Sequence, residues 1–302
     1  MRGRLLATAL VLALASSANG QTTASPAPVT APPKVPAGMQ YLYGSGEGAA
    51  ISRQAWRGVV GFARQQTRYR PRNSVVLAAG TTLAAPGFVP CGRKPLAAVF
   101  DVDETVLLNI GAEYDQAAGT PYSGARWNEW ERTGAGFAAE TPGAVEALGA
   151  LRKMGVTVIF NTNRVIENAD GSEKTIEQAG LGRAKYFPEP GHWREQTLYL
   201  AKSTSDEDKK KDGRRATIAA HYCVILMGGD QLGDFSDLFN QPAPPAPAPA
   251  VRRAATGLPL IAKKWGAGWF VLPNPVYGSG LAGTLDQVFP DHHWPPVAGA
   301  EK

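Results

Sequence analysis

The feature that most constrains the fold is a short apolar run, residues 97–100, which ends in the two carboxylates Asp101 and Asp103. An apolar run of this length is typical of a strand in a parallel sheet that is covered on both faces. Ligands of such sheets bind at the carboxyl ends of the strands, so chemistry is expected directly after this run. Two neighbouring carboxylates repel each other unless a cation or a proton separates them. The pair therefore indicates either a solvated acidic turn or a functional site.

The same pattern, an apolar run that ends in polar side chains, occurs again at residues 156–160 and 223–227. A helix is expected between the first two runs, because Thr141 can cap it, Pro142 suits its first turn and Gly155 can end it. The resulting strand–helix–strand unit predicts a right-handed crossover and an α/β fold with a parallel sheet. A last strand is expected at residues 269–272. The polar residues that follow the second and third runs are Thr162, Asn163, Asp230 and Asp234.

The start of the chain has the pattern of a secretory signal peptide over residues 1–20, with a basic start, an apolar core and small residues at a cleavage site. The apolar core is too short to span a bilayer, so we expect an exported, soluble mature protein without a stable membrane anchor. Residues 21–38 are predicted to be a disordered linker, and residues 39–92 an N-terminal helical arm. Residues 93–296 form the main predicted domain, with a cap segment at about 109–140 and a Pro/Ala-rich insertion at 241–255.

Charge and cysteine content narrow the class of protein. The net charge of +5 falls to +3 when Arg2 and Arg4 leave with the signal peptide, and this mild charge argues against a nucleic-acid polymer as partner. The two cysteines, Cys91 and Cys223, lie just before two of the predicted strands. In an oxidising compartment they form either a disulfide or two buried free thiols.

Several further elements follow from local patterns. Residues 47–69 carry apolar side chains at helical spacing and predict an amphipathic helix. Residues 75–83 are interpreted as a second short helix or an arm. The proline-rich insertion, residues 241–255, is expected to be extended.

Carboxylates, a hydroxyl group and lysines close to parallel strand ends suit phosphoryl transfer through an aspartyl phosphate. One carboxylate attacks phosphorus, and a second acid two residues further on protonates the leaving oxygen and then activates water. A hydroxyl group and backbone N–H groups hold the phosphoryl oxygens, while a lysine offsets their charge. A hard divalent ion with oxygen ligands, for which Mg²⁺ is the natural choice, lets a carboxylate approach an anionic phosphate.

The ordered motifs of the chain resemble those of the haloacid-dehalogenase (HAD) superfamily, and within it the secreted class C acid phosphatases, also called subfamily IIIB. The resemblance implies a HAD-like three-layer α/β/α core of Rossmann type with a small helical cap. It rests on Asp-Val-Asp-Glu-Thr-Val from Asp101, Asn-Thr-Asn-Arg from Asn161 and Gly-Asp-Gln-Leu-Gly-Asp-Phe from Gly229. Further matches begin at Leu42, Trp127, Pro142 and Pro273. The chain departs from the family pattern at Leu108, where an acidic residue is frequent.

The resemblance assigns roles at the matching positions. Asp101 would be the nucleophile and a metal ligand, and Asp103 the general acid/base with its backbone carbonyl as a further ligand. Thr162 would bind the phosphoryl group, with Asn163 nearby. Asp230 would complete the Mg²⁺ site and Asp234 would support it.

The lysine of the site is harder to place. The family pattern puts it shortly before an Arg-Arg pair, here Arg214 and Arg215. Lys209 fits best, about one residue away from the expected spacing, and Lys210 and Lys211 are the alternatives.

Aromatic side chains follow the first motif, in the segment where HAD phosphatases carry a cap. Tyr114, Trp127 and Trp130 could stack on an aryl group or a nucleobase of the substrate, or could pack the cap against the core. The four histidines have neither metal-ligand spacing nor a nucleophile partner, so they are assigned no role.

Together these features predict an exported, Mg²⁺-dependent acid phosphatase that hydrolyses small phosphate monoesters, with 5′-nucleotides among the candidate substrates. Three alternatives remain open: a binding protein for phosphate esters or nucleotides on the same fold, an interaction protein that works through its proline-rich segments, and a phosphotransferase that passes the phosphoryl group to an alcohol.

Overall fold

The computed structural model describes residues 34–205, 207–241 and 247–289. The predicted signal peptide at 1–20 and most of the predicted linker at 21–38 lie outside these residues, as does part of the proline-rich insertion. Within the described ranges, no helix is both long enough and apolar enough to cross a bilayer.

Five parallel strands form the central sheet, in the order β7-β6-β3-β8-β9. Strand β3 (Leu96–Phe100) lies in the middle, between β6 (Thr157–Val165) and β8 (Cys223–Gly229). The edges are β7 (Leu198–Ala201) and β9 (Trp269–Val271). The predicted strands and the α/β class with a parallel sheet are therefore confirmed.

The register aligns the carboxyl ends of β3 and β8 with the middle of β6, which continues to Val165. Phe100 of β3 pairs with Phe160 of β6 and with Gly228 of β8. The next residue, Asp101, donates its backbone N–H to the carbonyl oxygen of Gly228 at 3.0 Å. The polar residues after β3 and β8 consequently meet those of β6 at one edge of the sheet. Thr162 and Asn163 lie on β6 itself and not after it, because this strand is longer than the apolar run.

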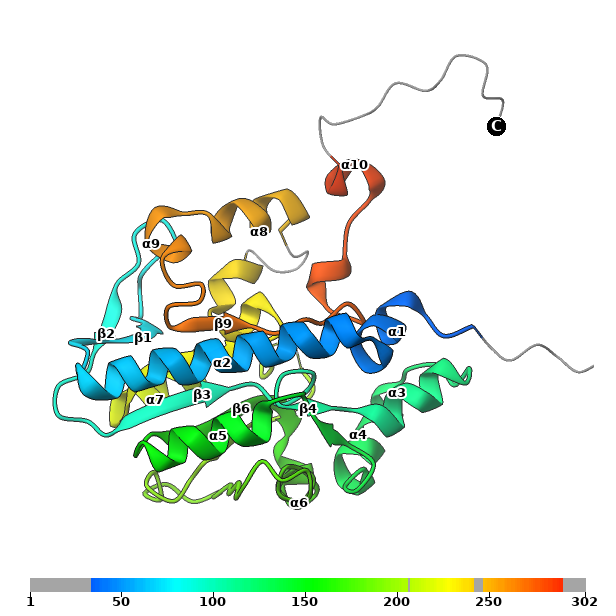
Figure 1. The fold of residues 1–302 in the computed structure, drawn as a ribbon, viewed down its shortest axis with the longest axis horizontal. Helices are drawn as coiled ribbons and strands as arrows, with labels where there is room; N and C mark the ends of the chain where they lie inside the picture. Colours follow the sequence, from blue (N-terminus) through cyan, green and yellow to red (C-terminus); the bar gives the residue numbers. More distant parts are fainter. Residues whose placement is uncertain (1–33, 206, 242–246, 290–302) are drawn as a thin grey trace, which may run out of the picture. The chain divides into compact units, whose positions relative to one another are not determined.

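Both faces of the sheet are covered, because the side chains of β3 alternate between two apolar cores. Ala98 and Phe100 pack into the core formed with α2 (Gly46–Arg68) and α5 (Ala144–Lys153). Ala97 and Val99 pack into the opposite core, which includes side chains of α7 (Asp212–His221). Figure 1 shows α2 and α5 on the near face of the sheet and α7 behind it. The result is a three-layer α/β/α architecture.

The remaining elements lie around this core (Figure 1). They are α1 (Ala37–Gly44), β1 (Asn73–Leu77), β2 (Phe88–Pro90), β4 (Leu107–Leu108), α3 (Ile110–Ala117), α4 (Gly124–Thr133), β5 (Ala139–Glu140), α6 (Ala169–Gln178), α8 (Pro249–Thr256), α9 (Pro259–Ala262) and α10 (Leu285–Val288). Short 3₁₀ turns lie at Ile166–Asn168, Leu232–Asp234, Asp237–Asn240 and Ser279–Leu281.

Two segments differ from the expectation. The interpretation of residues 75–83 as a helix is wrong, because β1 pairs antiparallel with β2 and buries Val75 and Val76 against the sheet. The indole N–H of Trp269 fixes this hairpin by donating to the carbonyl oxygen of Val75 at 3.0 Å. The insertion at 241–255 is not extended throughout, since α8 begins at Pro249, which suits a first helical turn.

The start of α5 also differs in detail from the expectation. The hydroxyl group of Thr141 does not cap the helix, because it donates to the carbonyl oxygen of Thr105 at 2.8 Å and accepts from Trp56 at 3.1 Å. The carboxylate of Glu140 instead accepts from the backbone N–H of Val145 at 2.8 Å. Thr141 thus ties α2 to the loop that follows Asp101.

Cys91 and Cys223 form a disulfide, which confirms the first of the two alternatives for these residues. Cys223 is the first residue of β8, and Cys91 lies in the loop before β3. The bond therefore joins the amino-terminal ends of neighbouring strands, opposite to the end that carries Asp101.

Candidate active site

The loop after β3 directs Asp101 and Asp103 into the site. Val102 between them is fully buried, and its carbonyl oxygen accepts the backbone N–H groups of Val106 at 3.0 Å and of Leu107 at 2.9 Å. This tight turn places the side chain of Thr105 next to β8, where its hydroxyl group donates to Asp230 at 2.9 Å. The first and third motifs are thus held together through the loop itself.

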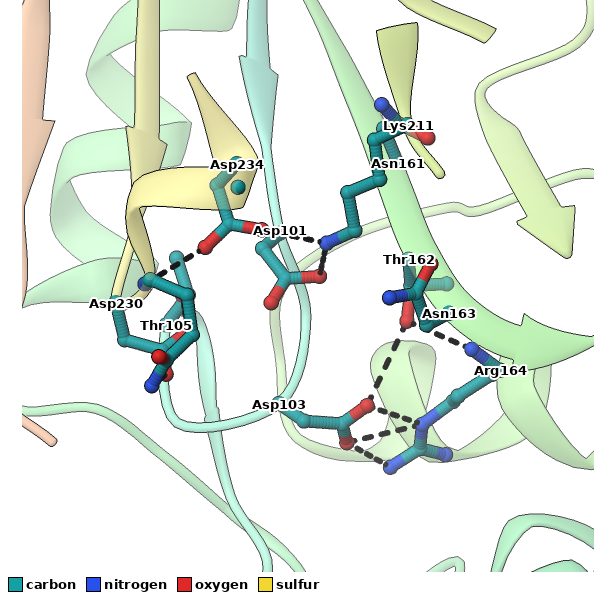
Figure 2. A network of polar contacts seen from close by, with 12 residues as sticks. Asp101, Asp103, Thr105, Asn161, Thr162, Asn163, Arg164, Lys211, Asp230 and Asp234 are labelled. Atoms are coloured by element: carbon teal, nitrogen blue, oxygen red, sulfur yellow. Dashed lines mark hydrogen bonds and ion pairs between the residues drawn. The ribbon is translucent and has the colours of Figure 1, made fainter. Parts of the chain in front are cut away.

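Lys211 is the lysine that reaches this site. Its Nζ lies 2.6 Å from Oδ1 of Asp101 and 2.7 Å from Oδ1 of Asp234, and its side chain is buried (Figure 2). Lys209, the residue preferred from the sequence, is exposed, and Lys210 pairs with Glu207 at the surface. Lys211 reaches the site because it immediately precedes α7, where its backbone N–H donates to Asp237 at 3.0 Å.

Three carboxylates crowd together around Lys211. Asp101, Asp230 and Asp234 each offer an oxygen atom within 4.8 Å of the others. Gly229 permits this approach, since a Cβ atom there would lie 2.2 Å from that of Asp234. Oxygen donors at this spacing fit a hard divalent cation. The carboxylate of Asp103 lies outside this group, so only its backbone carbonyl stays a predicted ligand.

Burial and mutual repulsion set the electrostatics of the cluster. Burial raises the pKa of Asp101 well above its ordinary value, with Lys211 opposing and Asp234 adding to the shift. Burial and Asp234 likewise raise the pKa of Asp230 to about 6. Although burial alone would lower it, the pKa of Lys211 is raised by Asp101 and Asp234. A bound cation would offset the repulsion among these carboxylates that contributes to the raised pKa values of Asp101 and Asp230.

Arg164 holds the carboxylate of Asp103 on the other side of the site. Its Nε and Nη2 donate to Oδ1 of Asp103 at 3.0 and 2.7 Å, and the guanidinium is buried (Figure 2). Asn109 donates to the same oxygen at 3.1 Å, and the hydroxyl group of Thr162 lies 3.5 Å from Oδ2. Arg164 and Thr162 are two residues apart on β6, so both side chains leave the strand on the same side. Arg164 has no predicted role, although it belongs to the second motif and its spacing from Thr162 is the signal that could have identified it.

Asn163 is exposed and pairs with a second arginine. Its Oδ1 accepts from Nη2 of Arg214 at 2.7 Å, and Nε of Arg214 donates to Asn161 at 2.7 Å. Burial and the neighbouring Arg215 lower the pKa of Arg214 to about 10. Arg214 enters the sequence prediction only as part of the Arg-Arg pair, whereas the structure places it against the second motif.

The aromatic residues of the cap line a groove. Tyr114 on α3, and Trp127 and Trp130 on α4, contribute to a groove of about 340 Å³, together with Tyr122. Tyr114 is 76% exposed, whereas Trp130 donates its indole N–H to Asn109 at 2.8 Å. Trp130 therefore ties the cap to the first motif, while Tyr114 and Trp127 offer aromatic surface.

Comparisons with known proteins bear on the family and the fold of the chain. Residues 65–280 match the family described as HAD superfamily, subfamily IIIB (acid phosphatase). The class C acid phosphatase from Bacillus anthracis is 22% identical, with 80% of this chain and 84% of that chain covered and a TM-score of 0.58. A second structure of the class C acid phosphatase from Bacillus anthracis, with tungstate bound, gives 23% identity, the same coverage of 80% and 84%, and a TM-score of 0.57. At these identities the two structures bear on the fold alone. A comparison with curated proteins found no match.

Proposed function

Because the chain belongs to subfamily IIIB of the HAD superfamily, a family of acid phosphatases, we propose that it is an exported phosphomonoesterase that uses Asp101 as its nucleophile and Mg²⁺ as its cofactor. The observation that supports this most directly is the contact of Lys211 with Asp101 at 2.6 Å, at the end of the central strand. A buried carboxylate beside a buried lysine, with a second acid two residues further on, suits attack on a phosphate ester.

In the proposed first step, a carboxylate oxygen of Asp101 attacks phosphorus and the bond from phosphorus to the leaving oxygen breaks. Lys211 holds Oδ1 of Asp101, so Oδ2 is the oxygen that we assign to the attack. Asp103 gives a proton to the leaving oxygen, which departs as an alcohol. The hydroxyl group of Thr162 and the side chain of Asn163 bind phosphoryl oxygens, and Lys211 offsets their negative charge.

In the second step, Asp103 takes a proton from water, which attacks phosphorus and releases inorganic phosphate and free Asp101. Arg164 and Asn109 aim the carboxylate of Asp103 in both steps. Asp101, Asp230, Asp234 and the carbonyl oxygen of Asp103 would hold Mg²⁺, which supplies the positive charge that lets an anionic ester approach a carboxylate. Asp103 thus serves as the proton donor of the first step and the proton acceptor of the second.

The groove on α3 and α4 supports a proposal on substrates, because its lining residue Trp130 donates to Asn109, which in turn contacts Asp103. Its aromatic lining, which includes Tyr114 and Trp127, suits a flat leaving group such as an aryl alcohol or a nucleoside. We therefore include aryl phosphates and 5′-nucleotides in the proposed substrate class.

Phosphate release by the purified mature protein tests the proposal. An aryl phosphate and a 5′-nucleotide are each incubated with Mg²⁺ and, separately, with a chelator. We expect release with Mg²⁺ that the chelator abolishes. Absence of release from both substrates by the folded protein with Mg²⁺ would contradict the proposal and favour a phosphate-ester-binding protein.

A further inference from the structure

Glu104, in the middle of the first motif, has an unusual backbone conformation and an unusual environment. Its φ of +51° makes it the one non-glycine residue with positive φ among those described, and its side chain is buried with 1% exposure. Such a conformation costs about 1 kcal/mol or more and persists only where surrounding contacts impose it. The contacts of the Glu104 carboxylate are therefore the ones that shape the loop between Asp103 and Thr105.

Those contacts come from two distant parts of the chain, which carry Tyr43 and Tyr277, and from the nearby Asn109. The hydroxyl group of Tyr43 on α1 donates to Oε1 of Glu104 at 3.0 Å. The backbone N–H of Asn109 donates to the same oxygen at 3.1 Å, and the hydroxyl group of Tyr277, after β9, donates to Oε2. Glu104 thus joins the N-terminal arm and the C-terminal segment to the catalytic loop.

Asn109 passes this restraint on to the reacting groups. Its side-chain N–H group donates to Glu104 at 3.0 Å and to Asp103 at 3.1 Å. Its side-chain oxygen accepts from Arg164 at 3.0 Å. A shift of Glu104 would therefore move Asn109, and with it the carboxylate of Asp103.

We propose that Tyr43 is a positioning residue of the reaction, which acts from the N-terminal arm by holding Glu104 and, through Asn109, the carboxylate of Asp103. The proposal rests on the proposed function, in which Asp103 is the acid and base. Tyr43 precedes residue 65, where the family match begins.

The contact pattern indicates that loss of the Tyr43 hydroxyl leaves the protein folded. Glu104 would still accept from both nitrogen atoms of Asn109 and from Tyr277. Removal of one of several hydrogen bonds to the loop is then expected to loosen its geometry. Because Tyr43 contacts neither the cluster around Lys211 nor Thr162 within the described ranges, the substrate-binding groups stay in place.

The test compares Tyr43→Phe with Tyr41→Phe, a matched control from the same helix whose hydroxyl group makes no hydrogen bond among the described residues. With an aryl phosphate, Tyr43→Phe is expected to lower kcat about 3- to 10-fold, as loss of one hydrogen bond predicts, and to leave KM within about 2-fold. Tyr41→Phe should match the wild type in both constants.

Hydrogen exchange of the backbone amides at 102–109 gives a readout that does not depend on turnover. Tyr43→Phe should speed exchange in this segment several-fold, with exchange in β6 and β8 unchanged. Unchanged kcat and unchanged exchange in Tyr43→Phe would overturn the proposal. So would a uniform rise in exchange over the whole protein, because that is the result of general destabilisation. If the wild type releases no phosphate, the proposed function fails, while the exchange data still decide whether Tyr43 orders the loop.

Discussion

Replacement of Lys211 by alanine probes the electrostatic centre of the site. The ammonium group makes charge-assisted contacts of 2.6 Å to Asp101 and 2.7 Å to Asp234, and the side chain is buried. Without it, three carboxylates that lie within 4.8 Å of one another lose their only protein cation among the described contacts. Removal of one partner from a buried ion pair costs about 3–5 kcal/mol, because the remaining charge is left uncompensated.

The same loss affects catalysis. Removal of one group that stabilises developing charge on the substrate lowers kcat by roughly 10²- to 10³-fold. We therefore expect Lys211→Ala to lower kcat with an aryl phosphate by roughly 10²- to 10³-fold. We also expect a lower free energy of unfolding without metal and partial recovery when Mg²⁺ is added.

Lys209→Ala is the matched control, because Lys209 has the same side chain two residues earlier and is exposed. Steady-state phosphate release and urea unfolding, each with and without Mg²⁺, measure both effects. Lys209→Ala should stay within about 2-fold of the wild type, as expected for a surface substitution. The reasoning is refuted if Lys209→Ala is as damaging as Lys211→Ala, or if Lys211→Ala keeps more than a third of the wild-type kcat.

Two further predictions concern stability. Replacement of both Cys91 and Cys223 by alanine should lower the free energy of unfolding in urea by about 2–5 kcal/mol, since the bond closes a loop of 132 residues, and an unchanged midpoint would contradict this. Burial raises the pKa of Glu131, and this effect outweighs the lowering by the hydrogen bonds from Asn168 and Val165. Folding therefore favours the protonated form of Glu131. The contribution of Glu131 to the free energy of unfolding is therefore full below its ordinary pKa of 4.5 and is lost as pH rises through the raised pKa. Glu131→Gln should flatten this decline when the thermal unfolding temperature is measured against pH. Curves of the variant and the wild type that run parallel would contradict the prediction.

The catalytic strand ends were predictable because their signals are local. The apolar run before Asp101 places that carboxylate directly after a buried strand, and the run before Thr162 places that side chain on the continuation of β6. Parallel pairing then brings the ends together, and the register of Phe100 with Phe160 and Gly228 confirms that step.

The positions that sequence reasoning missed depend on non-local geometry. Lys211, and not Lys209, reaches the carboxylates because it directly precedes α7. The backbone N–H of Lys211, which donates to Asp237, fixes this position. Residues 75–83 lack a strong strand pattern, and β1 forms because β2 and the sheet offer partners. The link from Tyr43 to Glu104 spans 61 residues, so no local pattern could reveal it.

The central claim is that the phosphoryl group of the substrate is transferred to Asp101 and forms a covalent intermediate there. Asp103→Asn removes the base that activates water, so it should accumulate phosphorylated protein when an activated aryl phosphate is added, and the phosphoryl group should be found by mass spectrometry on the peptide with Asp101. The double variant Asp101→Asn/Asp103→Asn should carry no phosphoryl group on this peptide. A phosphoryl group on another residue, or phosphate release that persists at the wild-type rate in Asp101→Asn, would contradict the account.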